Sequence, residues 1–482
     1  MTNNEYWTDI VVVGAGAVGS AITRELMKYQ LDVILVERFS DICGDASKSN
    51  NGTVCSGYDL TPDSLHAKLV IGGNQMLPQL AEELDFGYRR AGAIVVAFTP
   101  EDMQNLEKMY RNSRKVGLYD TELLTREKCL SLEPSLNPAI LGGLLSPREM
   151  PVDVMQMLIA FVENAVYNGA HLMLSTPVTG LVIEDDYVKA VRTPRGLINT
   201  KYVINAAGVH ADEIAKMAGV CNYRNYPRRG QVLVLDKDLS YAPSHIIQPC
   251  PNPLSRGKIL TRTYHGNLIC GPSAKNENDR EDRATDTETL DEIIRDVKRL
   301  VPAIQKKDTI TQYVGIRPTK TPVGWSINVS KVVHGYAEAI GITAGISAAP
   351  AIAAHIVDLL VDNGLCLVKN NNFNPYRKAI RRINKMSPTE RDEAIRRDPA
   401  YGNIVCRCEM VSEAEIIQAI HRVPGARTLD GVKRHLRTGM GRCNGSFCSP
   451  RIVDILAREL GVPIETIKKN EPGSEILVGK NR

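Results

Sequence analysis

Long apolar runs, aromatic side chains and an excess of either charge are scarce in this chain of 482 residues. No apolar run approaches the roughly 20 residues that span a bilayer, so we expect no transmembrane segment, although a partner could still attach the protein peripherally to a membrane. A net charge of +4, without a basic stripe interleaved with aromatics, argues against a nucleic-acid partner. The polar residues before position 10 lack the pattern of an export signal, which predicts a cytoplasmic protein.

The remaining composition is that of a globular protein with several domains. Hydrophobic residues make up 43% of the chain and charged residues 24%, and the length allows about three domains. The chain has eleven cysteines, and in a reducing compartment clustered thiols more often bind metal than form disulfides. Closely spaced cysteines are therefore candidate ligands.

A glycine-rich turn follows the first apolar run. Residues 10–13 are β-branched or apolar throughout, which predicts a strand buried on both faces. Gly14, Gly16 and Gly19 come next in the spacing G-x-G-x-x-G, and apolar residues then recur at helical intervals over residues 17–29. The glycines permit a tight turn and the close approach of a pyrophosphate to the helix N-terminus.

A second strand at residues 33–36 ends on the acid Glu37, which is placed to accept hydrogen bonds from ribose hydroxyls. Strand, turn, helix, strand and acid together predict a nucleotide-binding βαβ unit. The unit alone fits either NAD or FAD.

Helical and strand patterns continue to residue 220. The spacing predicts helices over residues 65–84, 101–116, 125–132 and 152–167, and strands over residues 93–98, 178–183 and 202–205. From residue 221 to about 335 short β-type runs dominate, at residues 231–235, 259–262, 267–270 and 332–333, with one helix near residues 290–300. This alternation predicts an α/β domain with an inserted antiparallel sheet. A final helix is expected over residues 348–361.

A composition break near residue 370 separates this part from the C-terminus. Residues 376–399 carry eight Lys or Arg against four Asp or Glu, which favours a solvated linker helix over a nucleic-acid site. We place a linker at residues 366–400 and a separate unit at residues 401–482.

The C-terminal unit contains four cysteines in two close pairs. Cys406 and Cys408 are separated by 34 residues from the pair Cys443 and Cys448, and helices predicted over residues 412–423, 428–436 and 451–460 could bring the pairs together. Four thiolates are the ligand set of a 2Fe–2S cluster or of a structural zinc ion. The single-residue gap in the first pair disfavours zinc, and glycines 439, 441 and 445 offer backbone amides to an anionic cluster.

Several distant segments resemble one family. The N-terminal turn, residues 49–57 (SNNGTVCSG), 205–208 (NAAG), 315–318 (GIRP) and 341–346 (GITAGI) resemble the FAD-dependent D-amino-acid oxidase/glycerol-3-phosphate dehydrogenase superfamily over residues 8–365. The cysteine unit resembles the bacterioferritin-associated-ferredoxin-like 2Fe–2S domain. This pairing is similar to the catalytic subunits of anaerobic glycerol-3-phosphate dehydrogenases, and to iron–sulfur flavoproteins acting on hydroxy acids or secondary amines.

The resemblance implies an α/β fold of the two-domain, Rossmann-like, glutathione-reductase type, with an inserted antiparallel-sheet substrate domain and a small helical iron–sulfur domain that holds its cluster through four cysteines. The FAD-binding parts would be about residues 1–85, 145–220 and 330–365, and the substrate domain about residues 86–144 and 221–329. FAD would contact the turn, the acid, the loop after it and three distant glycines: Gly14, Gly16, Gly19, Glu37, Arg38, Ser47, Asn50, Asn51, Gly208, Gly341 and Gly345.

The resemblance also implies a substrate site. Arg317 would bind the substrate's anionic group, and Cys55 and Tyr58 would lie beside the substrate. Family members acting on glycerol 3-phosphate usually have His at position 55 and Arg at position 59, where this chain has Cys55 and Asp59. The segment at Gly341 also looks one residue short. Compensating cations could come from a set of four: Arg228, Arg229, Arg262 and Lys320.

The expected reaction is oxidation of sn-glycerol 3-phosphate to dihydroxyacetone phosphate. His265 is the candidate base, and electrons would pass through the cluster to a partner protein subunit or to quinone. The alternatives are an L-2-hydroxyglutarate or other 2-hydroxy-acid dehydrogenase, an amino-acid or secondary-amine dehydrogenase, and a non-catalytic electron-transfer subunit.

Overall fold

A six-stranded sheet forms the centre of the nucleotide-binding part, and the computed structural model describes residues 4–251, 256–477 and 479. Its order is β20 (Ser326–Val329), β21 (Tyr336–Ile340), β13 (Tyr202–Asn205), β2 (Ile10–Val13), β3 (Val33–Val36) and β9 (His171–Met173). The strands from β21 to β9 are parallel, and β20 is antiparallel at the edge. Every residue of β2 and β3 is buried, as the β-branched runs predict.

Helices cover this sheet and build its core. α1 (Ala17–Leu26) packs on α5 (Val154–Tyr167) and α8 (Gly345–Asp362), and α8 also packs on α2 (Leu65–Leu84). By length and composition α8 could span a membrane, but more than half of it is buried inside this core. α1 ends three residues earlier than expected, because the backbone at residues 29–30 instead bonds to residues 368–369.

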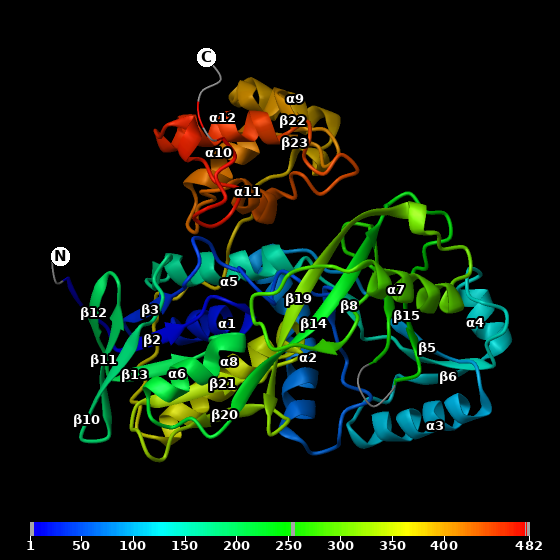
Figure 1. Cartoon of the computed structure of the whole chain (residues 1–482), viewed down its shortest axis with the longest axis horizontal. Coiled ribbons are helices and arrows are strands. Elements are labelled where there is room, and N and C mark those ends of the chain that lie inside the picture. Colours follow the sequence, from blue (N-terminus) through cyan, green and yellow to red (C-terminus); the bar gives the residue numbers. More distant parts are fainter. Residues whose placement is uncertain (1–3, 252–255, 478, 480–482) are drawn as a thin grey trace.

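A nine-stranded, mainly antiparallel sheet forms the second part, and two separate stretches of chain build it. The first stretch gives β5 (Ala93–Ala97), β6 (Glu122–Thr125) and β7 (Gly142–Ser146), with α3 (Pro100–Lys115) and α4 (Arg126–Leu132). The second gives β14 (Arg224–Leu235), β15 (Ile246–Pro249), β16 (Ile259–Arg262), β17 (Leu268–Gly271), β18 (Lys275–Asn276), α7 (Thr287–Leu300) and β19 (Thr309–Thr321). β14 and β19 form a long ribbon in Figure 1.

Smaller elements complete this fold. A four-stranded sheet joins β1 (Glu5–Trp7), β12 (Gly196–Asn199), β11 (Tyr187–Thr193) and β10 (Gly180–Glu184), with α6 (Ala211–Met217) nearby, and β4 (Thr53–Val54) pairs with β8 (Met150–Pro151). The strand expected at residues 332–333 is wrong: these residues form a bend between β20 and β21. The predicted α/β fold with an inserted antiparallel sheet is confirmed.

The C-terminal module lies over α5 (Figure 1). It contains α9 (Pro388–Arg397), β22 (Ile404–Cys406), β23 (Val411–Ser412), α10 (Glu413–His421), α11 (Leu429–Leu436) and α12 (Ser449–Leu460). Ser412 and Thr428 cap α10 and α11 with their side chains, as their positions predict. The module has a separate apolar core around Ile416, Val432 and Leu456.

The segment before the module is only partly a solvated helix. α9 is exposed as expected, but the chain before it runs along the first part, where Arg377 is buried in an ion pair with the carboxylate of Glu163. Arg422 of the module donates from Nε to the same carboxylate at 2.7 Å. A buried carboxylate thus fixes both the linking segment and the module, because leaving it unpaired would cost several kcal/mol.

A second buried ion pair joins the module to the loop after Glu37. Arg434 on α11 donates from Nε and Nη2 to Oδ2 of Asp41, at 3.0 and 2.8 Å. The exposed fraction of the two side chains is 5% and 3%. Beside them the Glu471 carboxylate accepts from the backbone N–H and the hydroxyl of Ser40.

Arg434→Met leaves the Asp41 carboxylate buried without a counterion. We expect the free energy of local opening of residues 404–460, measured by hydrogen exchange, to fall by about 3–5 kcal/mol. Lys469→Met is the matched control, because it breaks an exposed pair with Asp430 that should contribute less than about 1 kcal/mol. Equal losses in the two variants would contradict a structural role for the buried pair.

Candidate functional site

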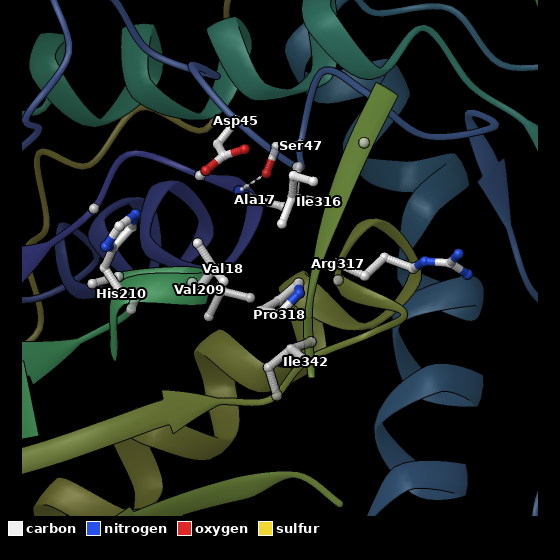
Figure 2. Close-up of a pocket in the computed structure, with 18 of the residues that line it drawn as sticks. Ala17, Val18, Asp45, Ser47, Val209, His210, Ile316, Arg317, Pro318 and Ile342 are labelled. Atoms are coloured by element: carbon white, nitrogen blue, oxygen red, sulfur yellow. Dashed lines mark hydrogen bonds between the residues drawn. The ribbon is translucent and has the colours of Figure 1, made fainter. Parts of the chain in front are cut away.

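A cavity of about 680 Å³ lies at the carboxyl ends of β2, β3 and β13. It is lined by the glycine-rich turn, the loop at residues 43–51, the β14–β19 ribbon and the N-terminus of α8. Ligands of open α/β sheets bind at this edge. Figure 2 shows Ala17, Ser47 and Ile316 close together in the upper part of the view, with Val209 and Ile342 below them.

The glycines of the turn are required by close contacts. A Cβ on Gly19 would lie 1.9 Å from the carbonyl oxygen of Gly14, and Gly14 itself has φ of +102°. Gly16 precedes α1, and the backbone N–H of Ala17 donates to Ser47 Oγ at 2.9 Å. The turn therefore brings the start of α1 against the cavity.

The acid at the end of β3 also lines the cavity. The Glu37 carboxylate accepts from the backbone N–H groups of Ala15 at 2.8 Å and Phe39 at 3.0 Å, while burial raises its pKa. Arg38 lines the cavity too, stacks on Phe39 and pairs with Glu281 at 3.0 Å. This is the donor and acceptor set that a ribose needs.

The loop after β3 presents polar groups to the cavity. Asn50 is held by its own loop, because its Nδ2 donates to Ser47 O at 2.8 Å. Asn51 Nδ2 donates to Gly271 O at 3.2 Å, whereas Asn51 Oδ1 is buried without a partner in the part of the chain that is described. A buried acceptor left open at a cavity wall is available to a ligand. Gly208, Gly341 and Gly345 line the same cavity.

Arg317 on β19 is a partly buried cation without an ion pair among the described residues. Its Nη2 donates to Ser273 O at 2.5 Å, and Figure 2 shows the side chain extending from β19 away from α1. Burial, with the nearby charge of Arg228, lowers the pKa of Arg317 to about 10. An anion entering the cavity would remove this penalty, since a guanidinium binds carboxylate or phosphate in a bidentate manner.

A second cavity of about 300 Å³ adjoins the first and is lined by Cys55, His66, Glu149 and Arg256. Arg256 also lines the first cavity. Its guanidinium donates to the carboxylate of Asp59 and, at 3.3 Å, to Cys55 Sγ, and it lies 4.0 Å from Glu149 Oε1. The two residues that depart from the family pattern thus meet at one arginine.

Sequence reasoning missed this arginine and the acid beside it. Arg256 lies outside every motif of the sequence. The only feature that could have pointed to it is the opposite charge of Asp59. Glu149 is buried, burial raises its pKa, and its Oε2 has no partner among the described residues. Burial, opposed by Arg256, raises the pKa of Cys55 to about 11, so its thiol stays neutral. Burial lowers the pKa of His66, which lies 4.1 Å from the Trp325 ring, so its imidazole is neutral as well.

Two predicted residues lie elsewhere. His265 lines neither cavity: its Nε2 is 2.7 Å from Asp153 Oδ2 at the start of α5, a place that spacing along the sequence could not predict. Tyr58 is fully buried beneath Arg256, and its hydroxyl donates to Gln248 Oε1 at 3.3 Å. Of the four candidate compensating cations only Arg228 lines a cavity, while Arg229 pairs with Glu277 and Asp282.

The four cysteines of the module form two pairs of thiols. Cys408 Sγ lies 3.8 Å from Cys443 Sγ, and the Cys448 thiol donates to the Gly445 carbonyl at 3.9 Å. The neighbouring Cys448 thiol, with the backbone N–H groups of Glu409 and Gly439, lowers the pKa of Cys406 to about 6. No three ligand side chains in the described part of the chain surround a single ion site. Two thiol pairs with amide donors match the ligand set of a binuclear cluster.

The comparisons with known proteins agree with this geometry. Residues 9–359 match the family described as FAD dependent oxidoreductase, and residues 404–458 match the BFD-like 2Fe–2S binding domain. The chain belongs to the FAD-dependent oxidoreductase family. The residues that line the first cavity of this flavoprotein fit FAD, since the turn, Glu37 and the open Asn51 Oδ1 offer the groups that the cofactor needs, and the four cysteines fit a 2Fe–2S cluster.

Relatives of the flavoprotein cover both of its parts. It is 38% identical over 475 residues to "Glycerol 3-phosphate dehydrogenase" of Caloramator mitchellensis, covering 98% of this chain and 99% of that protein. It is 26% identical over 496 residues to one subunit of the anaerobic glycerol-3-phosphate dehydrogenase of Escherichia coli, covering 95% and 89%. The structure of dithionite-reduced L-α-glycerophosphate oxidase from Mycoplasma pneumoniae with FAD bound is 27% identical, with a TM-score of 0.73 over 77% of this chain and 98% of that one.

Gly19→Ala should abolish FAD binding, because the new methyl group collides with the Gly14 carbonyl and pushes α1 away from the turn. The FAD content of the purified protein, read from its visible absorbance, measures this. Gly72→Ala is the matched control in α2, where the methyl group meets only Ala351 Cβ at 3.4 Å. Full FAD content in Gly19→Ala would contradict the close contact.

Proposed function

We propose that this flavoprotein oxidises sn-glycerol 3-phosphate to dihydroxyacetone phosphate. The observation that carries the proposal is Arg317, a partly buried guanidinium with no carboxylate partner among the described residues, at the wall of the first cavity. The substrate named for the Caloramator relative, which matches over its whole length, supports the same anionic alcohol.

Arg317 binds the phosphate and so fixes the position of the neighbouring carbinol carbon. Bound FAD supplies the hydride acceptor. The N-terminal turn of α8 lines both cavities, and a helix N-terminus favours a bound anion. Arg256, which is paired with the Asp59 carboxylate, lines both cavities.

The hydroxyl proton passes to His66 in this proposal. A neutral imidazole is the form that accepts a proton, and His66 lines the second cavity in that form. Cys55 is unsuited, because a thiol with a pKa of about 11 would first have to lose its own proton. His265 takes no part, since it lies outside both cavities.

A 2-hydroxy diacid is the weaker alternative. One relative, named L-2-hydroxyglutarate dehydrogenase, from Caenorhabditis elegans, is 29% identical over 275 residues and covers 55% of this chain. A second carboxylate would need a second cation. Arg256 already faces the carboxylates of Asp59 and Glu149, so Arg228, which lines the first cavity and donates to Asn276 Oδ1 at 2.8 Å, would have to take this role.

Electrons leave through the 2Fe–2S cluster to a partner protein or quinone in this proposal. The Escherichia coli relative is named as a subunit, and the matched domain is described as a 2Fe–2S binding domain. A cluster suits an acceptor that takes single electrons.

Arg317→Met should lower kcat/KM for sn-glycerol 3-phosphate by about 100-fold, or about 3 kcal/mol, mainly through KM, with partial recovery in Arg317→Lys. Dye reduction under anaerobic conditions measures it. In the unsubstituted protein KM should rise as pH increases through about 10, because Arg317 binds the anion only while it is protonated.

The variant His66→Asn distinguishes the role of proton acceptor from the role of binding the phosphate. It should lower kcat more than it raises KM, because the residue holds a proton and not the phosphate. Unchanged kinetics in Arg317→Met, or faster oxidation of a diacid than of sn-glycerol 3-phosphate, would reject the proposed substrate.

A further inference from the structure

One side of the cysteine site is open to solvent. Cys406 and Cys448 are buried, whereas Cys408 is exposed and Cys443 is half-buried. Phe447, beside Cys448, is 80% exposed, and Met410, two residues after Cys408, is 41% exposed. We call the four residues Arg407, Cys408, Met410 and Phe447 the cluster face.

The exposed Phe447 belongs to the loop that carries Cys443 and Cys448. Ser446, which precedes Phe447, donates from its backbone N–H and its hydroxyl to the Cys443 carbonyl at 3.0 and 2.7 Å, so the exposed ring stands on the ligand loop itself. Only six phenylalanines occur in the chain, and placing one in water beside a ligand has no benefit for folding. Aromatic, Met and Arg side chains are the types enriched at the centres of protein interfaces.

The charges around the face are mostly positive. Arg407 is exposed and Arg451 is exposed, and neither forms an ion pair with a carboxylate in the described part of the chain. Glu409 turns inward, where it pairs with Lys237 at 2.7 Å and Arg437 at 3.2 Å. At the rim, Arg442 pairs with Asp236, and Asp238 lies 3.8 Å from it.

The opposite side of the ligand loop rests on the first part of the protein. Asn444 Nδ2 donates to the carbonyl of Ile310 on β19 at 3.0 Å. Gly315 lies five residues further along β19 and contacts the backbone of Ser49 in the loop at residues 43–51. At the spacing of a β-strand, Ile310 and Gly315 are roughly 17 Å apart. One side of the ligand loop is therefore connected by β19 to the first cavity. The cluster face is the opposite side of this loop and is exposed to solvent.

We propose that the cluster face is the docking surface for a one-electron carrier protein with an acidic surface around its redox centre. The inference rests on the proposed function. Oxidation of one secondary alcohol to a ketone releases two electrons and two protons, so two carriers each take one electron and the protons go to solvent.

The match to a protein surface rests on the composition of the face. Phe447 and Met410 are two isolated apolar side chains on loops, too few to insert into a bilayer as an amphipathic helix does. Arg407 and Arg451, which have no carboxylate partner in the described part of the chain, complement acidic side chains and steer an acidic partner toward the exposed thiols.

The test uses the full-length protein with both cofactors bound, under anaerobic conditions, with an acidic flavodoxin as the probe. Binding is measured by interferometry at low ionic strength. Phe447→Ser and Arg407→Glu should each weaken binding by about tenfold or more, and added salt should weaken it further. Trp7→Ser is the matched control, because Trp7 is 75% exposed on β1, in the four-stranded sheet and outside the C-terminal module, and it should leave the affinity unchanged.

Three results would overturn the docking surface. The Phe447→Ser variant could bind flavodoxin as tightly as the unsubstituted protein while its cluster spectrum is intact. The unsubstituted protein could fail to bind flavodoxin at low ionic strength, or it could bind the basic cytochrome c more tightly than flavodoxin. Phe447-dependent binding to anionic phospholipid vesicles or self-association would reassign the face to a membrane or a second copy. Met410→Ser repeats the test if Phe447→Ser loses its cluster.

The two proposals can fail separately. If sn-glycerol 3-phosphate does not bleach the flavin of the unsubstituted protein while flavodoxin still binds through Phe447, the proposed substrate is wrong and the docking surface stands. If bleaching persists in Phe447→Ser and flavodoxin binding is unchanged, the docking surface is wrong and the substrate stands.

Discussion

The pairing of β14 with β19 is the constraint on which the functional parts of this flavoprotein depend. The two strands pair from Arg224 and Thr321 at one end to Leu235 and Thr309 at the other. On β19 Arg317 faces the FAD site, the hydroxyl of Tyr313 donates to the Asn50 carbonyl at 2.7 Å, and Ile310 accepts from the cluster loop. One hydrogen-bonded ribbon therefore positions Arg317, the loop at residues 43–51 and the cysteine site together.

The C-terminal module is held against the rest of the protein by buried ion pairs and is not joined to it by a flexible linker alone. Two buried carboxylates, Glu163 and Asp41, each pair with arginines from the module or the segment before it. Asp41 follows Glu37 by only four residues, so the wall of the FAD site and the module share a loop. Such buried pairs contribute specificity of orientation more than net stability. A fixed distance between the two cofactor sites is what electron transfer within a chain requires.

The sequence was sufficient for elements with strong periodicity. The strands β2, β3 and β13 and the helix α2 begin and end at the predicted residues, because β-branched runs and helical spacing are local signals. Arg256 could not be predicted, since its partner Asp59 lies 197 residues away and neither belongs to a motif. His265 and the segment around Arg377 differ from expectation for the same reason: ion pairs with Asp153 and Glu163 decide their places, and such contacts leave no pattern in the sequence.

The most direct test is an anaerobic titration of the protein with sn-glycerol 3-phosphate, following flavin absorbance and the electron paramagnetic resonance of the cluster in the same sample. The account predicts that the flavin bleaches and that the signal of the reduced cluster rises with it, in the absence of any partner. A bleached flavin beside a cluster that stays oxidised would contradict electron transfer between the two sites, and an unbleached flavin would contradict the substrate.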